Sequence, residues 1–114
     1  MKKLLIPSVA LALVLLAVGL PLATAASTTV TVKASEFKYA LSKASVARGT
    51  VTFKVKNTGH IKHDFKINGK KTKLLSPGGT TTLKVSFGKR GKFTYLCTVP
   101  GHAQAGMKGR LTVK

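Results

Sequence analysis

The chain has 114 residues and carries 20 lysines and arginines against two acidic residues, which gives a formal net charge of +18 at pH 7. A chain of this length forms one domain with one modest core and is too short for two. Its single cysteine, Cys97, excludes an internal disulfide. In an oxidising compartment such a thiol is buried, paired with another molecule or bound to a metal.

The first 25 residues have the pattern of a signal-peptide helix. Lysines at positions 2 and 3 precede an apolar run from Leu4 to Leu20, and small residues occupy Ala23 to Ala25. This order predicts cleavage after Ala25, which leaves a lipid-free domain over residues 26–114. The alternative is a retained membrane anchor, since the apolar run approaches the roughly 18 residues of a transmembrane candidate. We expect an exported protein that is periplasmic, extracellular or associated with the cell envelope.

From Ser27 onward, apolar and polar residues alternate with the period of two that is typical of strands. No segment has helical periodicity, and turn signals rich in Gly, Asn and Pro separate the apolar runs. The alternating segments are 30–32, 37–39, 51–55, 65–67, 83–87, 93–97 and 111–113. About seven short strands, each with one apolar face, predict an all-β Greek-key sandwich of two antiparallel sheets. The stretch from Leu41 to Ala47 is compatible with a loop, a bulge or a short strand.

The positive charge indicates anionic partners and says nothing about the fold. Lysines recur along almost every predicted strand and turn, which favours a basic surface all round over one local patch. All five phenylalanines, Phe37 included, lie on strand patterns where burial is expected. Stacking on nucleic-acid bases is therefore not favoured. We expect a monomer that meets acidic proteins or an anionic membrane or cell-wall surface.

One segment near the C-terminus holds three potential metal ligands at equal steps. Four residues separate Cys97 from His102, and four more separate His102 from Met107. A proline and two glycines between them supply the turns that would aim all three side chains at one point. Two histidines and a thiolate, with a weak axial thioether, form the electron-transfer copper sites of proteins. The spacing therefore indicates such a site, with one histidine still missing.

The second histidine has to come from another segment, and His60 and His63 are the candidates. Both lie in the connection that leads to the predicted strand at 65–67. His63 is better placed because it almost directly precedes that strand. His60 is then an ordinary loop histidine or a second, weaker metal contact at the surface.

Several segments together are similar to a known family: Phe37 with Tyr39, Gly49–Phe53, the turn Asn57–Gly59 leading to His63–Phe65, and Tyr95–Gly109. In these segments the chain resembles the cupredoxins, blue copper proteins of the plastocyanin and azurin type. Its loop spacing is most similar to that of azurin-like and auracyanin-like members. The resemblance implies a β-sandwich that holds one copper ion, cycles it between Cu(I) and Cu(II), and carries single electrons between redox partners.

The resemblance also implies roles for particular side chains. Asp64 stands where the family often has asparagine, and it would tie the first-histidine segment to Thr98. The implied copper ligands are His63, Cys97 and His102 as strong equatorial donors and Met107 as the weak axial donor.

A docking site for redox partners, expected to be acidic, follows from the same resemblance. The electron would pass through the exposed edge of His102. The surrounding residues Val99, Pro100, Ala103 and Ala105 would form a small apolar docking face. The alternative is that these four residues only pack the loop.

Three other classes of function are alternatives to electron transfer. One is a copper protein that stores or delivers the ion without redox turnover. Another is a cationic surface-binding protein with a structural metal, for which zinc is the natural ion. An enzyme is not expected. Catalysis at a metal needs an open coordination position or a second metal centre, and His60 is the one histidine left once His63 and His102 are used. No further acid pair is available, because Glu36 and Asp64 are the two side-chain carboxylates of the sequence.

Overall fold

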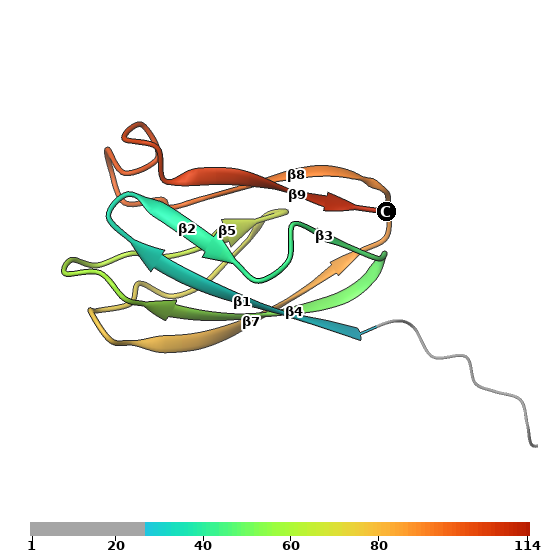
Figure 1. The fold of residues 1–114 in the computed structure, drawn as a ribbon, viewed down its shortest axis with the longest axis horizontal. Helices are drawn as coiled ribbons and strands as arrows, with labels where there is room; N and C mark the ends of the chain where they lie inside the picture. The colour runs from blue at the N-terminus through green and yellow to red at the C-terminus, as the bar shows by residue number, and fades with distance from the viewer. Residues whose placement is uncertain (1–26) are drawn as a thin grey trace, which may run out of the picture.

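The structure, a computed structural model, describes residues 27–114, and every regular element in this range is a β-strand (Figure 1). The strands are β1 (Ser27–Ser35), β2 (Lys38–Leu41), β3 (Ser45–Val46), β4 (Gly49–Asn57), β5 (Lys66–Ile67), β6 (Lys70–Lys71), β7 (Thr80–Phe87), β8 (Gly91–Leu96) and β9 (Lys108–Val113). The expected all-β class is confirmed. The stretch from Leu41 to Ala47, whose sequence is compatible with a loop, a bulge or a short strand, contains the two-residue strand β3. The strand β6 adds to the predicted set, and its two residues are too few to show an alternating pattern.

The signal-peptide helix and its cleavage site, expected in residues 1–26, lie outside the described residues. Within residues 27–114, the structure contains no helix of the length and apolar character needed to cross a membrane.

The strands form two sheets packed face to face. One sheet has the order β2-β1-β4-β7 and the other the order β3-β9-β8-β5-β6. Most neighbours are antiparallel, but β1 pairs with β4 and β3 pairs with β9 in parallel, so the expectation of two purely antiparallel sheets is wrong. After β2 the chain passes through β3 in the other sheet and re-enters beside β1. This crossover leaves β4 running in the same direction as β1.

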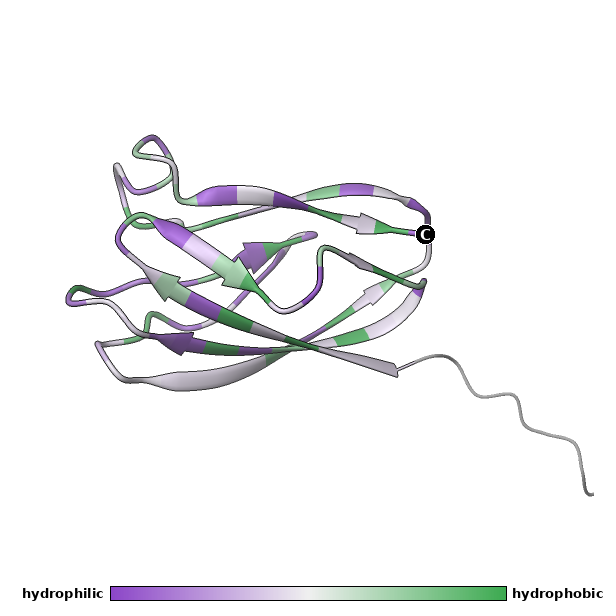
Figure 2. Ribbon diagram, viewed as in Figure 1, coloured by the Kyte–Doolittle hydropathy of each residue, from purple (hydrophilic) through white to green (hydrophobic). Residues whose placement is uncertain are grey.

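The inward-facing rows of the two sheets form one hydrophobic core. Along β4, Val51, Phe53 and Val55 are at most 1% exposed, whereas the residues between them face outward. Figure 2 shows the same alternation of hydrophobic and hydrophilic residues along several strands. The Phe53 ring lies 5.2 Å from that of Phe65, just before β5, so aromatic contacts join the two sheets. Each such buried side chain contributes about 1.5–3 kcal/mol, which makes the sandwich a firm base for its loops.

Phe37 departs from the expected burial. It lies with Glu36 in the turn between β1 and β2, where the chain leaves the sheet, and it is 38% exposed. Its ring packs edge to face against His102 with a centroid distance of 4.9 Å. The turn therefore directs Phe37 toward the C-terminal loop instead of the core.

Three connections gather at one end of the sandwich, at the left of Figure 1: the β1–β2 turn, the β4–β5 segment and the β8–β9 loop. The register sets this arrangement, because Ala34 of β1 pairs with Asn57 at the end of β4. Leu96 pairs with Lys108 across the base of the β8–β9 loop. Segments far apart in the sequence thus present their polar side chains to one another.

Candidate metal centre

The β8–β9 loop is held in shape by its own backbone. Gly101 and Gly106 have φ values of 85° and 114°, which favour glycine and allow the tight turns of the loop. The Met107 N–H donates to the His102 carbonyl at 3.1 Å, and the Cys97 N–H donates to the Met107 carbonyl at 3.2 Å. These bonds close the loop on itself, so its three potential ligands share one compact unit.

The segment that carries His63 is fixed from two sides. The His63 N–H donates to the Leu75 carbonyl at 3.1 Å, and the Leu75 N–H donates back at 2.8 Å. Asn57, fully buried at the end of β4, donates through Nδ2 to the carbonyls of Ile61 and Leu75 at 2.8 and 2.9 Å. Its Oδ1 accepts the Gly59 N–H at 2.8 Å. One buried amide therefore shapes the connection that presents His63.

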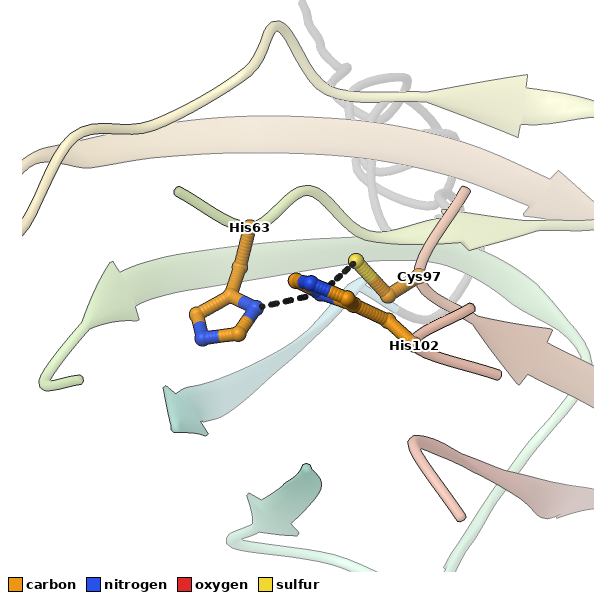
Figure 3. A group of neighbouring side chains, drawn as sticks. All are labelled: His63, Cys97 and His102. Carbon is orange, nitrogen blue, oxygen red and sulfur yellow. Dashed lines mark hydrogen bonds between the residues drawn. The ribbon is translucent and has the colours of Figure 1, made fainter. Parts of the chain in front are cut away.

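The structure brings together His63, Cys97 and His102 (Figure 3). The Nδ1 atoms of the two histidines lie 3.2 Å apart, and Sγ of Cys97 lies 3.6 Å from Nδ1 of His102. All three donor atoms fall within 4.8 Å of one another. Metal–nitrogen and metal–sulfur bonds of about 2.0–2.3 Å place two donors of one ion roughly 3–4 Å apart, so the separations of 3.2 and 3.6 Å from Nδ1 of His102 fit donors of a single metal ion.

The surroundings of the three side chains also suit a soft metal. His63, Cys97 and His102 are 0%, 1% and 8% exposed, so water is largely excluded. Burial, and secondly the nearby His63 ring, hold the pKa of His102 below its usual value, which keeps a neutral ring with a lone pair for a metal. Burial raises the pKa of the Cys97 thiol, so a thiolate there requires a compensating positive charge of the kind a bound cation supplies. A thiolate with two imidazoles is a donor set for copper.

Met107 lies beside this cluster and is fully buried. It forms a small apolar group with Ala34 and Cys97, against which Tyr39 and Val99 pack. This group is separate from the main hydrophobic core. A thioether in such a place could bind a soft metal weakly as well as serve as a packing group.

Asp64 connects the two segments that carry the donors. Its Oδ1 accepts the Thr98 N–H at 2.7 Å, and its Oδ2 accepts the Thr98 hydroxyl. Its backbone carbonyl accepts the hydroxyl of Tyr39 from β2. Because Asp64 follows His63 and Thr98 follows Cys97, these bonds fix the distance between the neighbouring histidine and thiol.

Glu36 is a site residue that sequence reasoning did not place. Its Oε1 lies 2.7 Å from Nε2 of His63, on the side of the ring opposite Nδ1. This hydrogen bond from His63 is the main cause that lowers the pKa of Glu36, to about 2, while partial burial opposes it. Composition held a signal: the chain has two acidic side chains, and both lie next to His63. In so basic a chain, the position of its few carboxylates is informative.

The residues predicted to form a docking face surround His102. Pro100 and Ala105 are exposed, and Val99 and Ala103 are partly exposed. The edge of His102 is less accessible than expected, at 8% exposure, because Phe37 covers it. Leu74, Val99 and Pro100 line a shared surface groove, and Leu74 is 48% exposed. The apolar surface near His102 is therefore larger than the sequence indicated.

His60 lies apart from the three donor atoms. Its side chain is 94% exposed, and its Nδ1 lies 3.4 Å from Oε2 of Glu36. It does not belong to the group formed by His63, Cys97 and His102.

Comparisons with known proteins agree with this fold. The chain is similar to reduced auracyanin from Roseiflexus castenholzii, with 25% identity, 80% of this chain and 99% of that chain covered, and a TM-score of 0.66. Auracyanin A, a "blue" copper protein from Chloroflexus aurantiacus, shares the fold at 20% identity, with 78% of this chain and 100% of that chain covered and a TM-score of 0.64. The copper-resistant cuproprotein CopI from Pseudomonas aeruginosa is 44% identical over 41 residues, which is 36% of this chain and 23% of CopI. The matched segment thus spans about a quarter of that curated relative.

The family model of the cupredoxin-like domain matches residues 8–113. The chain belongs to the cupredoxin-like family. Together with the buried histidine and cysteine donors, this assigns one copper ion to the protein as its cofactor.

Proposed function

We propose that this protein is an exported type 1 copper protein that shuttles single electrons between redox partners. The observation that carries the proposal is the buried arrangement of two imidazole nitrogens and one thiol sulfur within 4.8 Å. His63, Cys97 and His102 would hold the ion, and Met107, buried beside Cys97, would be a fourth and weaker ligand. When bound, copper supplies one-electron chemistry between its Cu(I) and Cu(II) forms.

The role of the chain is to hold its donors in one geometry for both oxidation states. Hydrogen bonds from Thr98 to Asp64, from Asn57 to Leu75 and between His63 and Leu75 restrain both donor segments. Restrained donors rearrange little when the charge of the site changes, which favours fast electron transfer. The same packing keeps water away from the donors, because each is at most 8% exposed.

The proposed docking face for redox partners comprises Val99, Pro100, Ala103 and Ala105, extended by Phe37 and Leu74. Phe37 lies against His102, so this face is close to the donor cluster. Lys71 and Lys73 line the same groove as Leu74 and Pro100. An apolar patch bordered by lysines suits a partner whose own docking patch is apolar with an acidic rim.

The test of this function is redox cycling of the purified copper protein. We expect the bound copper to be reduced and reoxidised repeatedly without loss, with one electron exchanged per chain. Titration with a reductant and an oxidant gives the number of electrons exchanged per chain. The copper content, measured before and after, gives the fraction of copper retained. A protein that releases its copper on reduction, or that cannot be reoxidised, would contradict an electron-carrier role.

Copper storage or delivery is the second candidate, and the identity to the copper-resistant cuproprotein CopI over 41 residues favours it. In that role the ion itself would leave the site. Competition with a Cu(I) chelator separates the two functions: a carrier retains copper during redox cycling, whereas a delivery protein transfers it readily to an acceptor. Sensitivity of the host to copper after deletion of the gene would further support a role in resistance.

We propose a carrier and not an enzyme because His63, Cys97 and His102 form the one group of potential metal ligands found within residues 27–114, so no second metal centre is present there. Two of the three histidines of the chain lie in the buried cluster, and the third, His60, is exposed. Both acidic side chains already make hydrogen bonds at the same cluster. General acid–base catalysis by a carboxylate requires one that is free to reach a substrate, so neither Glu36 nor Asp64 suits that role.

Export is proposed from the signal-peptide pattern of residues 1–25. The mature protein is expected to begin at Ala26, one residue before β1 starts at Ser27. The intact mass of the protein from its native host measures this directly. A species that retains Met1 to Ala25 would instead indicate a membrane-anchored carrier.

A further inference from the structure

We propose that Glu36 is a positioning residue that fixes the ring of His63 and stabilises oxidised copper relative to reduced copper. This inference rests on the proposed function and goes beyond it by naming a residue that sets the reduction potential. A line of contacts runs from the Glu36 carboxylate through the His63 ring to the ring nitrogen that would bind the metal. Glu36 Oε1 lies 2.7 Å from His63 Nε2, and His63 Nδ1 on the other side faces His102 Nδ1 at 3.2 Å.

The first consequence concerns the orientation of His63. A carboxylate accepts a hydrogen bond, so Nε2 carries the proton and Nδ1 keeps its lone pair for the metal. The ring is fully buried, and this contact gives the polar Nε2–H a hydrogen-bond partner. Glu36 thereby selects both the tautomer and the direction of the ring.

Glu36 is itself held in place by the backbone. Its carboxylate accepts the His60 N–H at 3.0 and 3.1 Å, and Oε1 accepts the Ile61 N–H at 3.4 Å. Its side chain is 27% exposed. A carboxylate fixed by several donors next to a buried ring acts as a preorganised negative charge, which a freely solvated side chain would not provide.

Gly59 is the second observation that points to this contact. A Cβ at this position would collide with Glu36 Oε1 and lie 3.1 Å from His63 Nε2. Gly59 does not have a positive φ, so its backbone tolerates a side chain. The absence of a side chain therefore serves to leave space for the carboxylate and the imidazole to meet.

The electrostatic consequence has a definite sign. A negative charge transmitted through the His63 ring stabilises the more highly charged Cu(II) form more than the Cu(I) form, so it lowers the reduction potential. The chain has two acidic residues, Glu36 and Asp64, and 20 basic ones. The overall positive charge of the protein therefore acts to raise the reduction potential, in the opposite direction to Glu36. Removal of the Glu36 charge is expected to raise the potential.

The test compares copper-loaded wild-type protein with the Glu36→Gln variant, which can still accept hydrogen bonds but has no charge. Loss of a carboxylate that supports a ligating histidine typically weakens metal binding by about 10–100 fold. We expect a loss at the low end of that range for Cu(II) and a smaller one for Cu(I). A tenfold change in the ratio of these affinities corresponds to about 59 mV, so the reduction potential is expected to rise by less than this amount.

Two further variants separate the contact from its side effects. Ser86→Lys adds the same unit of charge at an exposed position of β7, opposite Thr50 at the far end of β4, and it is expected to leave the potential nearly unchanged. Gly59→Ala keeps the charge but displaces the carboxylate, and it is expected to shift the potential upward. In the Cu(I) form, ¹⁵N spectra of His63 should show the proton on Nε2 in the wild type and a weaker hydrogen bond there in Gly59→Ala.

A potential in Glu36→Gln and Gly59→Ala equal to or below that of the wild type would overturn the role of Glu36. Such a result, with copper bound and redox cycling intact, would leave the electron-carrier function standing. If Glu36→Gln does not fold, the potential of Gly59→Ala decides. A wild-type protein that does not cycle its copper would instead refute the proposed function itself.

Discussion

The Cys97→Ser variant is expected to lose the intense visible absorption of the Cu(II) protein completely. Strong colour at a copper site of this type depends on the bond between copper and a thiolate, and Cys97 is the one cysteine of the chain. A serine hydroxyl has nearly the same size and does not form that bond. Absorption spectra after addition of one equivalent of Cu(II), with circular dichroism to check folding, measure the effect.

Three matched variants test Met107 as a ligand and His63, in place of His60, as the first histidine ligand. Met107→Leu is expected to weaken or shift the colour without removing it, because a weak axial donor is lost. His63→Ala should bleach the protein, whereas His60→Ala should change little, since the His60 side chain is 94% exposed. If His60→Ala bleaches the colour and His63→Ala does not, the assignment of the first histidine is wrong. A protein that retains zinc and rejects copper would refute the carrier hypothesis altogether.

Salt is expected to slow electron transfer with an acidic protein partner steeply and to leave transfer with small neutral reductants almost unchanged. The formal charge is +18 for the whole sequence, and loss of Lys2 and Lys3 lowers it by two units. Long-range attraction can raise association rates by roughly 10 to 1,000 fold. Screening acts over about 8 Å at physiological ionic strength, so added salt removes most of this gain. Stopped-flow reduction across a salt series, with both kinds of reductant, measures the effect.

Charge reversals locate the surface that guides the partner. Lys73→Glu changes the rim of the groove formed with Leu74 and Pro100, whereas Lys84→Glu changes the exposed outer face of β7 by the same charge. Docking near His102 predicts that the bimolecular rate falls more in Lys73→Glu than in Lys84→Glu. The competing hypothesis is that the lysines hold the protein to an anionic membrane or wall polymer. It predicts salt-sensitive retention at the envelope together with electron-transfer rates that do not respond to salt.

The copper centre combines features that act in opposite directions on its charge balance. The basic surface raises the electrostatic potential around the whole domain, whereas Glu36 and Asp64 place negative charge beside His63. The first feature governs encounters with partners over a long range. The two carboxylates act over one or two hydrogen bonds and affect the reduction potential of the ion. Measurement of association rates and of reduction potentials in the same variants would show how independent the two are.

The sequence by itself determined the fold class and the composition of the C-terminal loop. Alternation with a period of two is a local property, because neighbouring side chains in a strand point to opposite faces. Valines and phenylalanines on β1, β4 and β7 could therefore be predicted as inward-facing, and they are buried. The equal spacing of Cys97, His102 and Met107 is likewise a property of one continuous segment.

Tertiary structure alone decided which distant groups meet at that loop. The parallel pairing of β1 with β4 brings the β1–β2 turn next to the β4–β5 segment, so Glu36 contacts His63 across 27 positions of the chain. The same turn carries Phe37 out of its alternating pattern and onto His102. No local pattern encodes such contacts, because they depend on strand order and crossover direction, which are selected by the packing of the whole sandwich.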